Sequence, residues 1–170
     1  GEETGPITRA VLAGLLRPVL SETVNYVNAP IIAEARGIRV TESRSAGLGD
    51  FTSLLSVEAS TDRGTKEISG TLFGRNEIRI VRIDGYSVDV RPDGTMLVAP
   101  HVDKPGIIGK VGTILGSRGI NIAGMHVGRK EGAAGGPAIM VLSVDSAIPS
   151  DAMKEIEQVE GIESVKQVSF

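Results

Sequence analysis

Three residues between 101 and 124 have the side chains and the spacing that a binding site for a small zwitterion needs. Asp103 lies two residues before Pro105, where a strand gives way to a predicted helix, so its carboxylate can cap that helix or accept from an ammonium group. Gly106 removes a side chain there and lets a ligand carboxylate approach the backbone N–H groups of the first helical turn. Asn121 opens the next strand with a carboxamide, which both donates and accepts. The segment therefore predicts a site for a free amino acid.

The same residues also fit other roles. An Asp-x-Pro-Gly sequence before a helix is what an ordinary cap and turn require. His101 fits a packed or surface histidine. A third alternative is a small stand-alone enzyme in which His101 and Asp103 act as an acid–base pair.

Arginines in the upstream half form a second candidate site, for an anion. In the predicted hairpin 77–90, strict alternation puts Arg79 on the apolar face. A charge there is costly unless it reaches an edge or meets an anion, and Arg91 follows its strand beside that position. The alternative is a set of solvated arginines, with Arg82 near Asp89.

The elements that position the first site follow the order strand, helix, strand, strand, helix, strand. The hydrophobic pattern predicts them at 96–102, 105–118, 120–129, 138–144, 150–157 and 162–168. This order is the ferredoxin-like βαββαβ unit, in which two helices cover one face of a four-stranded antiparallel sheet.

The upstream half predicts an α+β domain with two helices and a mixed or antiparallel sheet. Apolar residues recur at helical spacing from Ile7 to Leu20. A second helix is predicted at 29–36, with Asn28 as N-cap and Gly37 as its stop. Predicted strands follow at 38–42, 52–59, 66–73, 77–83 and 86–90. We therefore expect domains at 1–94 and 95–170, with 1–5 as a linker.

Composition narrows the classes of function. A net charge of -3 argues against nucleic-acid and anionic-membrane partners. The chain has no cysteine, which excludes disulfides and thiolate chemistry, and its two histidines lack the spacing of a metal motif. The glycines of 109–119 do not follow a strand as a dinucleotide site requires. From these patterns we expect no catalytic residues, metal or cofactor in this chain. Because the sequence has no predicted membrane span or signal peptide, we expect the chain to be cytoplasmic.

Specific motifs resemble known families. His-x-Asp-x-Pro-Gly at 101–106, followed by Ile-Asn-Ile at 120–122, resembles the ACT domain, the amino-acid-sensing module of metabolic enzymes. The segments 23–38 and 69–90 resemble the intervening, or allosteric substrate-binding, domain of the long bacterial form of D-3-phosphoglycerate dehydrogenase. The resemblance extends over nearly the whole chain, from residue 7 to residue 170.

This resemblance implies a regulatory region without chemistry of its own. The parent enzyme would use NAD to oxidise 3-phosphoglycerate in the first step of L-serine synthesis, with its catalytic domains outside this sequence. L-serine would bind for feedback inhibition between the ACT domains of a homodimer or tetramer, to His101 and Asp103 of one subunit and Asn121 of the other. Some relatives hold an anion where Arg79 and Arg91 stand. The alternative is the regulatory part of another amino-acid enzyme, such as L-serine dehydratase.

Overall fold

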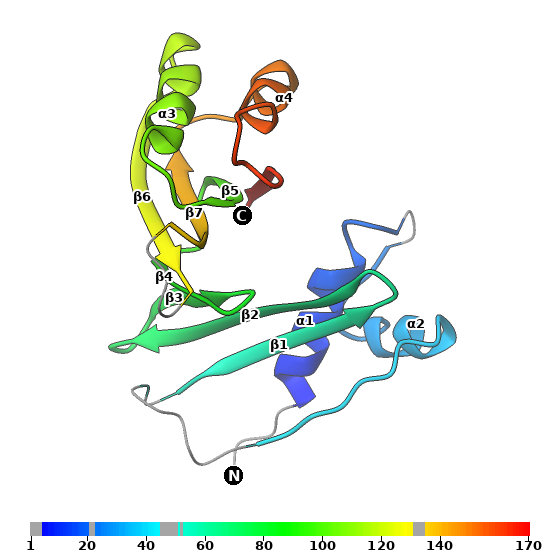
Figure 1. Ribbon diagram of the computed structural model, residues 1–170. Coiled ribbons are helices and arrows are strands. Elements are labelled where there is room, and N and C mark those ends of the chain that lie inside the picture. Colours follow the sequence, from blue (N-terminus) through cyan, green and yellow to red (C-terminus); the bar gives the residue numbers. More distant parts are fainter. Residues whose placement is uncertain (1–4, 21–22, 45–50, 52, 131–134) are drawn as a thin grey trace. The chain divides into compact units, whose positions relative to one another are not determined.

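The computed structural model describes residues 5–20, 23–44, 51, 53–130 and 135–170. Its elements fall into two units, residues 1–49 and residues 50–170 (Figure 1). The second unit contains two four-stranded sheets, and the predicted domain boundary at residue 94 falls between them. That boundary stays a prediction, because the units themselves divide at residue 49.

Two helices form the first unit. Helix α1 (Gly5–Leu16) ends two residues before Pro18, whose ring cannot continue a helix, and is therefore shorter than predicted. Helix α2 (Ala29–Ala35) is followed by Gly37 with a φ of +71°, which confirms the predicted stop. The helices share a small core made of Leu12, Ala13, Leu16, Val24, Ala29 and Ala33.

Two features of this unit differ from the prediction. Asn28 takes the predicted N-cap position of α2, but its Oδ1 accepts from the N–H of Asn25 at 2.8 Å, so its side chain does not cap the helix. Residues 38–42 form no strand. Ile38 packs against the helical core instead, so its burial reflects contact with helices and not a place in a sheet.

The upstream sheet, here called sheet A, is an antiparallel meander in the order β1-β2-β3-β4. Its strands are β1 (Leu55–Thr61), β2 (Gly64–Phe73), β3 (Glu77–Ile83) and β4 (Tyr86–Val90). The predicted strand 52–59 thus begins later, and residue 52 lies outside the described residues. Asp84 and Gly85 join β3 to β4 with positive φ angles of 49° and 80°, as in the turns that match strand twist.

A bulge between β3 and β4 moves Arg79 to the other face from the one predicted. Close to the turn the strands pair regularly, but Ile80 then pairs with Val90 instead of Asp89. One residue of β3 faces two of β4, so Ile80 shares the apolar face with Val90. The prediction that Arg79 interrupts that face is wrong, because it assumed unbroken alternation. Arg79 lies on the polar face, with Asp89.

The second sheet, sheet B, confirms the βαββαβ order. Its elements are β5 (Thr95–Val102), α3 (Ile107–Ser117), β6 (Ile122–Arg129), β7 (Pro137–Val144), α4 (Ser150–Glu157) and β8 (Lys166–Ser169). The strands are antiparallel neighbours in the order β6-β7-β5-β8, as the ferredoxin-like unit requires. β8 is shorter than the predicted strand 162–168, and Ile162 forms an isolated bridge with His101.

The central strands of sheet B, β5 and β7, are buried on both faces. Helices α3 and α4 cover one face, where a core includes Leu97, Ala99, Met140, Leu142, Val111, Leu115 and Ile156. The alternate residues of β5 and β7 face the other way and pack against β4, in a cluster of Tyr86, Val88, Val90, Met96, Ile139 and Val141. β7 therefore reads as an almost continuous buried run. None of the described helices is long and apolar enough to cross a bilayer.

Gly128 allows β6 to approach β4 closely. A Cβ at this position would collide with the backbone carbonyl oxygen of Ser87 and lie 3.2 Å from both Ile139 Cγ2 and Val88 Cγ1. The two sheets thus meet backbone against backbone at this point, with no side chain between them.

We expect Gly128→Ala to destabilise the fold by about 1–3 kcal/mol, because the added methyl group has no room. Gly124→Ala, also on β6, is the matched control, since a Cβ there would meet only Ser143 of β7, at 3.8 Å. Urea unfolding followed by circular dichroism measures both free energies. Equal stability of the two variants would contradict the close packing of β6 on β4.

Candidate functional site

Asp103 lies where β5 ends and α3 begins. Its N–H donates to the carbonyl oxygen of Gly136 at 2.8 Å, and its Oδ2 lies 2.7 Å from Nε of Arg129 at the end of β6. The Asp103 side chain is 17% exposed, whereas that of Arg129 is 60% exposed. No described side chain caps the first turn of α3. Asp103 therefore serves as the partner of an arginine and not as a helix cap.

Gly106 precedes the first residue of α3. Its φ is +92°, in the region that favours glycine, while a Cβ there would meet nothing within 4 Å. The glycine is thus required by the backbone conformation as well as leaving open space. The uncapped N–H groups at the start of α3 can donate to an anion.

His101 is buried on β5. Its residue is 1% exposed, and Nδ1 lies 3.2 Å from the carbonyl oxygen of Ala99. Asp103 has Arg129 as its partner, so His101 and Asp103 do not form the acid–base pair of a stand-alone enzyme. The predicted ligand contact of His101 stays a prediction.

Asn121 lies at the opposite end of sheet B. β5 and β6 are each antiparallel to β7, so they run parallel to one another. Asp103 follows the end of β5, whereas Asn121 precedes the start of β6. The eight residues of β7 between these ends span roughly 25 Å. Within one chain, Asp103 and Asn121 cannot contact the same amino acid.

The amide of Asn121 is held by Asp145. Nδ2 of Asn121 donates to Oδ2 of Asp145 at 2.8 Å, and the N–H of Asp145 donates to the backbone oxygen of Asn121 at 3.2 Å. This pairing fixes the orientation of the amide. It uses the donor Nδ2 and leaves the acceptor Oδ1 available for a ligand.

Arg129 and Asp145 contact two of the predicted site residues, and the sequence analysis named neither of them. Neither belongs to a recognisable sequence motif. The signal that could have found them is strand register. Arg129 and His101 both pair with Ala138, from its two sides, and therefore lie in one row across the same face.

The candidate anion site already contains a carboxylate. Oε1 of Glu77 accepts hydrogen bonds from Nη2 of Arg79, at 2.6 Å, and from Nη2 of Arg91. Nη1 of Arg79 lies 3.1 Å from Asp89, so Asp89 is the partner of Arg79 and not of Arg82. A hollow of about 740 Å³ adjoins Glu77 and Arg91. Anion binding here stays a prediction, in which an anion would compete with Glu77.

The described residues contain no group of three acidic or histidine side chains that could hold a metal ion. Asp103 and Asp145 lie at different ends of the sheet and have separate partners. Asp103 is held by an ion pair and Asn121 by a hydrogen bond.

Comparison with known proteins gives two family matches. Residues 1–84 match the D-3-phosphoglycerate dehydrogenase intervening domain, and residues 101–161 match the ACT domain. A D-3-phosphoglycerate dehydrogenase of Synechocystis is 44% identical over 97% of this chain and 29% of its own length. That of Bacillus subtilis is 42% identical over 99% of this chain and 32% of its own length. The chain thus spans about a third of the relatives that it matches.

The ion pairs of Glu77 predict a contribution to stability that depends on pH. Hydrogen bonds from Arg91 and Arg79 lower the pKa of Glu77 below its ordinary value of 4.5. Such a carboxylate stabilises the folded state above the unfolded pKa, and this contribution is lost as the pH falls through the folded pKa. We expect wild type to exceed Glu77→Gln in stability at neutral pH, and the difference to shrink in acid.

Urea unfolding of both proteins across this pH range measures the difference. Glu58→Gln is the control, because it removes an exposed carboxylate from β1 of the same sheet. A difference between wild type and Glu77→Gln that stays constant down to the lowest pH would contradict the ion pairs.

Proposed function

Because the chain belongs to the D-3-phosphoglycerate dehydrogenase family, as its intervening and ACT domains, we propose that it is the serine-sensing regulatory region of such an enzyme. The whole protein would oxidise 3-phosphoglycerate with NAD, in the first step of L-serine synthesis. The catalytic residues and the NAD site would belong to the part of the enzyme outside this chain, which spans 29% of the Synechocystis relative. The proposed domains are residues 1–94 and 95–170.

The proposed ligand is L-serine, bound between the ACT domains of two subunits. The observation that carries this proposal is the separation of Asp103 and Asn121 at opposite ends of sheet B. Each residue has a polar side chain and an ordered partner, and within one chain only one of the two can reach a given ligand. Two copies of the chain would combine them.

Strand β6 gives the geometry for this combination. It is an edge strand of sheet B, so one row of its backbone groups has no partner strand in the sheet. Met125 on this strand is 54% exposed. Antiparallel pairing with β6 of a second copy, about a two-fold axis, would bring Asn121 of that copy toward the end of β6 where Arg129 contacts Asp103. Symmetry then makes two equal sites.

In such a site, the groups of both chains match the parts of an amino acid. The carboxylate of Asp103 would accept from the ammonium group, and the uncapped first turn of α3 beside Gly106 would donate to the carboxylate. Oδ1 of Asn121 from the second copy would complete the polar contacts. His101 would contribute through the edge of its buried ring.

Binding between two subunits supplies a route to feedback inhibition. A ligand shifts an equilibrium only by its different affinity for the two states, so serine would favour the subunit arrangement that closes its site. The catalytic domains of the parent enzyme would sense that arrangement. The oligomer would be a homodimer or a tetramer.

We expect L-serine to bind the wild-type chain and to bind about tenfold or more weakly to Asp103→Ala and to Asn121→Ala, because each loses a hydrogen bond to a charged group. After the subunits of the two variants have exchanged, each mixed dimer should regain one site, since one of its two sites then has both residues intact, whereas the homodimers of either variant regain none. Titration calorimetry measures the affinities and the number of sites.

Glycine and L-phenylalanine are the control ligands, and Asn76→Ala, which removes an exposed amide from the turn between β2 and β3, is the control variant. Failure of a dimeric wild-type chain to bind serine would refute the proposal. Failure of the mixture to recover any binding would refute the assignment of the two residues to different chains.

A further inference from the structure

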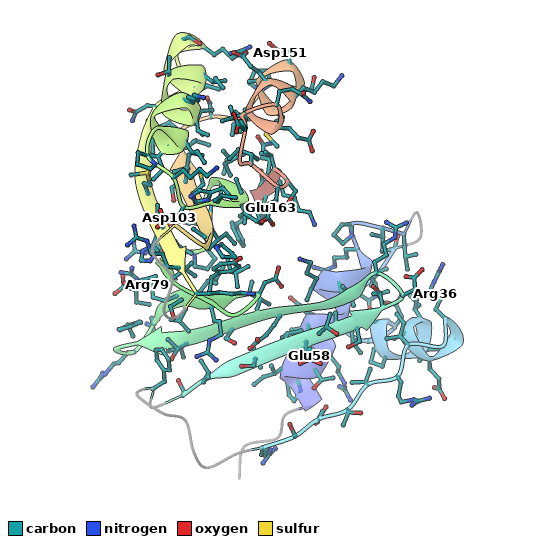
Figure 2. All side chains as sticks on the ribbon, in the orientation of Figure 1. Arg36, Glu58, Arg79, Asp103, Asp151 and Glu163 are labelled. Atoms are coloured by element: carbon teal, nitrogen blue, oxygen red, sulfur yellow. The ribbon has the colours of Figure 1, made fainter. Side chains whose placement is uncertain are left out.

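Arg129 lies at the end of β6, and only one nitrogen of its guanidinium contacts another described side chain. Its Nε contacts Oδ2 of Asp103 at 2.7 Å, while the side chain is 60% exposed. Among the described residues, its two terminal nitrogens have no other hydrogen-bond or ion-pair partner. Figure 2 marks Asp103 beside β6. The pair is therefore an arginine fork with free donors, held next to a mostly buried carboxylate.

The row formed by Arg129, Ala138 and His101 places the guanidinium on the face of sheet B that carries α3. Neighbouring strands lie about 4.8 Å apart, so Arg129 is roughly 10 Å from His101 across the row. Asp103 and the start of α3 lie at the same end of the sheet. The free donors thus adjoin the end at which Asp103 would meet a ligand.

An exposed ion pair by itself stabilises a fold little. Here the pair has a further property, because it presents a negative and a positive group side by side. An α-amino acid carries an ammonium and a carboxylate at a similar short separation. The ammonium group of the amino acid can therefore contact the carboxylate of Asp103 while its carboxylate contacts the guanidinium of Arg129.

We propose that Arg129 binds the α-carboxylate of the amino acid with its terminal nitrogens, while Asp103 binds the ammonium group. This inference rests on the proposed function and assigns the group that makes the site specific for a zwitterion. Arg129 keeps its Nε contact with Asp103, so the ligand completes a ring of alternating charges. An amine without a carboxylate leaves the guanidinium uncompensated, and an acid without an amine leaves Asp103 uncompensated.

The test compares three ligands on the full chain: L-serine, ethanolamine, which is serine without its carboxylate, and 3-hydroxypropionate, which is serine without its ammonium group. Arg129→Gln should weaken serine about tenfold or more, because a charged two-donor contact to the carboxylate is lost. Ethanolamine should not lose affinity, since it has no carboxylate and the variant removes a positive charge beside Asp103. Titration followed by NMR measures weak as well as strong binding.

Two further variants sharpen the result. Arg129→Lys keeps the charge without the fork and should bind serine more tightly than Arg129→Gln but less tightly than wild type. Arg82→Gln removes an exposed arginine from sheet A and should leave serine affinity unchanged.

Unchanged serine affinity in Arg129→Gln would overturn this inference while the proposed function stands. An equal loss for serine and ethanolamine would also overturn it, because Arg129 would then act only by positioning Asp103. A dimeric wild-type chain that binds no serine would overturn the proposed function and this inference together.

Discussion

The burial of β5 and β7, the central strands of sheet B, on both faces is the constraint on which the rest of the second unit depends. Alternation along β5 and β7 sends apolar side chains to both sides, so neither face can remain in water. The helices cover one face and β4 covers the other. A polar ligand or a second subunit therefore has to meet this sheet at its edges or its ends, which is where the unpaired strand and the charged side chains lie.

Each end of sheet B carries a pair of polar side chains in contact with one another. At one end a carboxylate is held by an arginine, and at the other a carboxamide is held by a carboxylate. In each pair one side chain fixes the direction of the other, which reduces the rotamer freedom that binding would otherwise remove. Both ends of one sheet thus carry polar groups that are ordered in advance.

Much of the architecture was predictable from sequence because it follows from periodicity and turn chemistry. The βαββαβ order and the hairpin at Asp84 and Gly85 are of this kind. The bulge beside Ile80 was not, since an extra residue leaves no mark in a pattern of apolar residues. Apolar and polar residues alternate in the segment 38–42 as they do in a strand, but the segment forms no strand, because Ile38 packs against helices.

The candidate site divides in the same way. The sequence correctly placed Asp103 at the turn after β5 and Asn121 before β6, because these positions follow from local pattern; their contact with a ligand stays a prediction. It did not reveal Arg129 or Asp145, since these partners depend on which residues face each other across β6 and β7 and at their ends. It also offered Asp103 as a helix cap, because the competing arginine lies 26 positions away along the chain.

The glycine at 128 has a mechanical consequence. Where two strands meet through side chains, a shift of one is absorbed by rotamer changes before it reaches the other. At Gly128 no side chain intervenes, so β6 bears on the backbone of β4 directly. A displacement of this edge strand toward sheet A would therefore meet the backbone of β4, which is hydrogen-bonded to β3 in the meander. The edge strand that would pair with a second subunit is thus also the strand that contacts the backbone of sheet A.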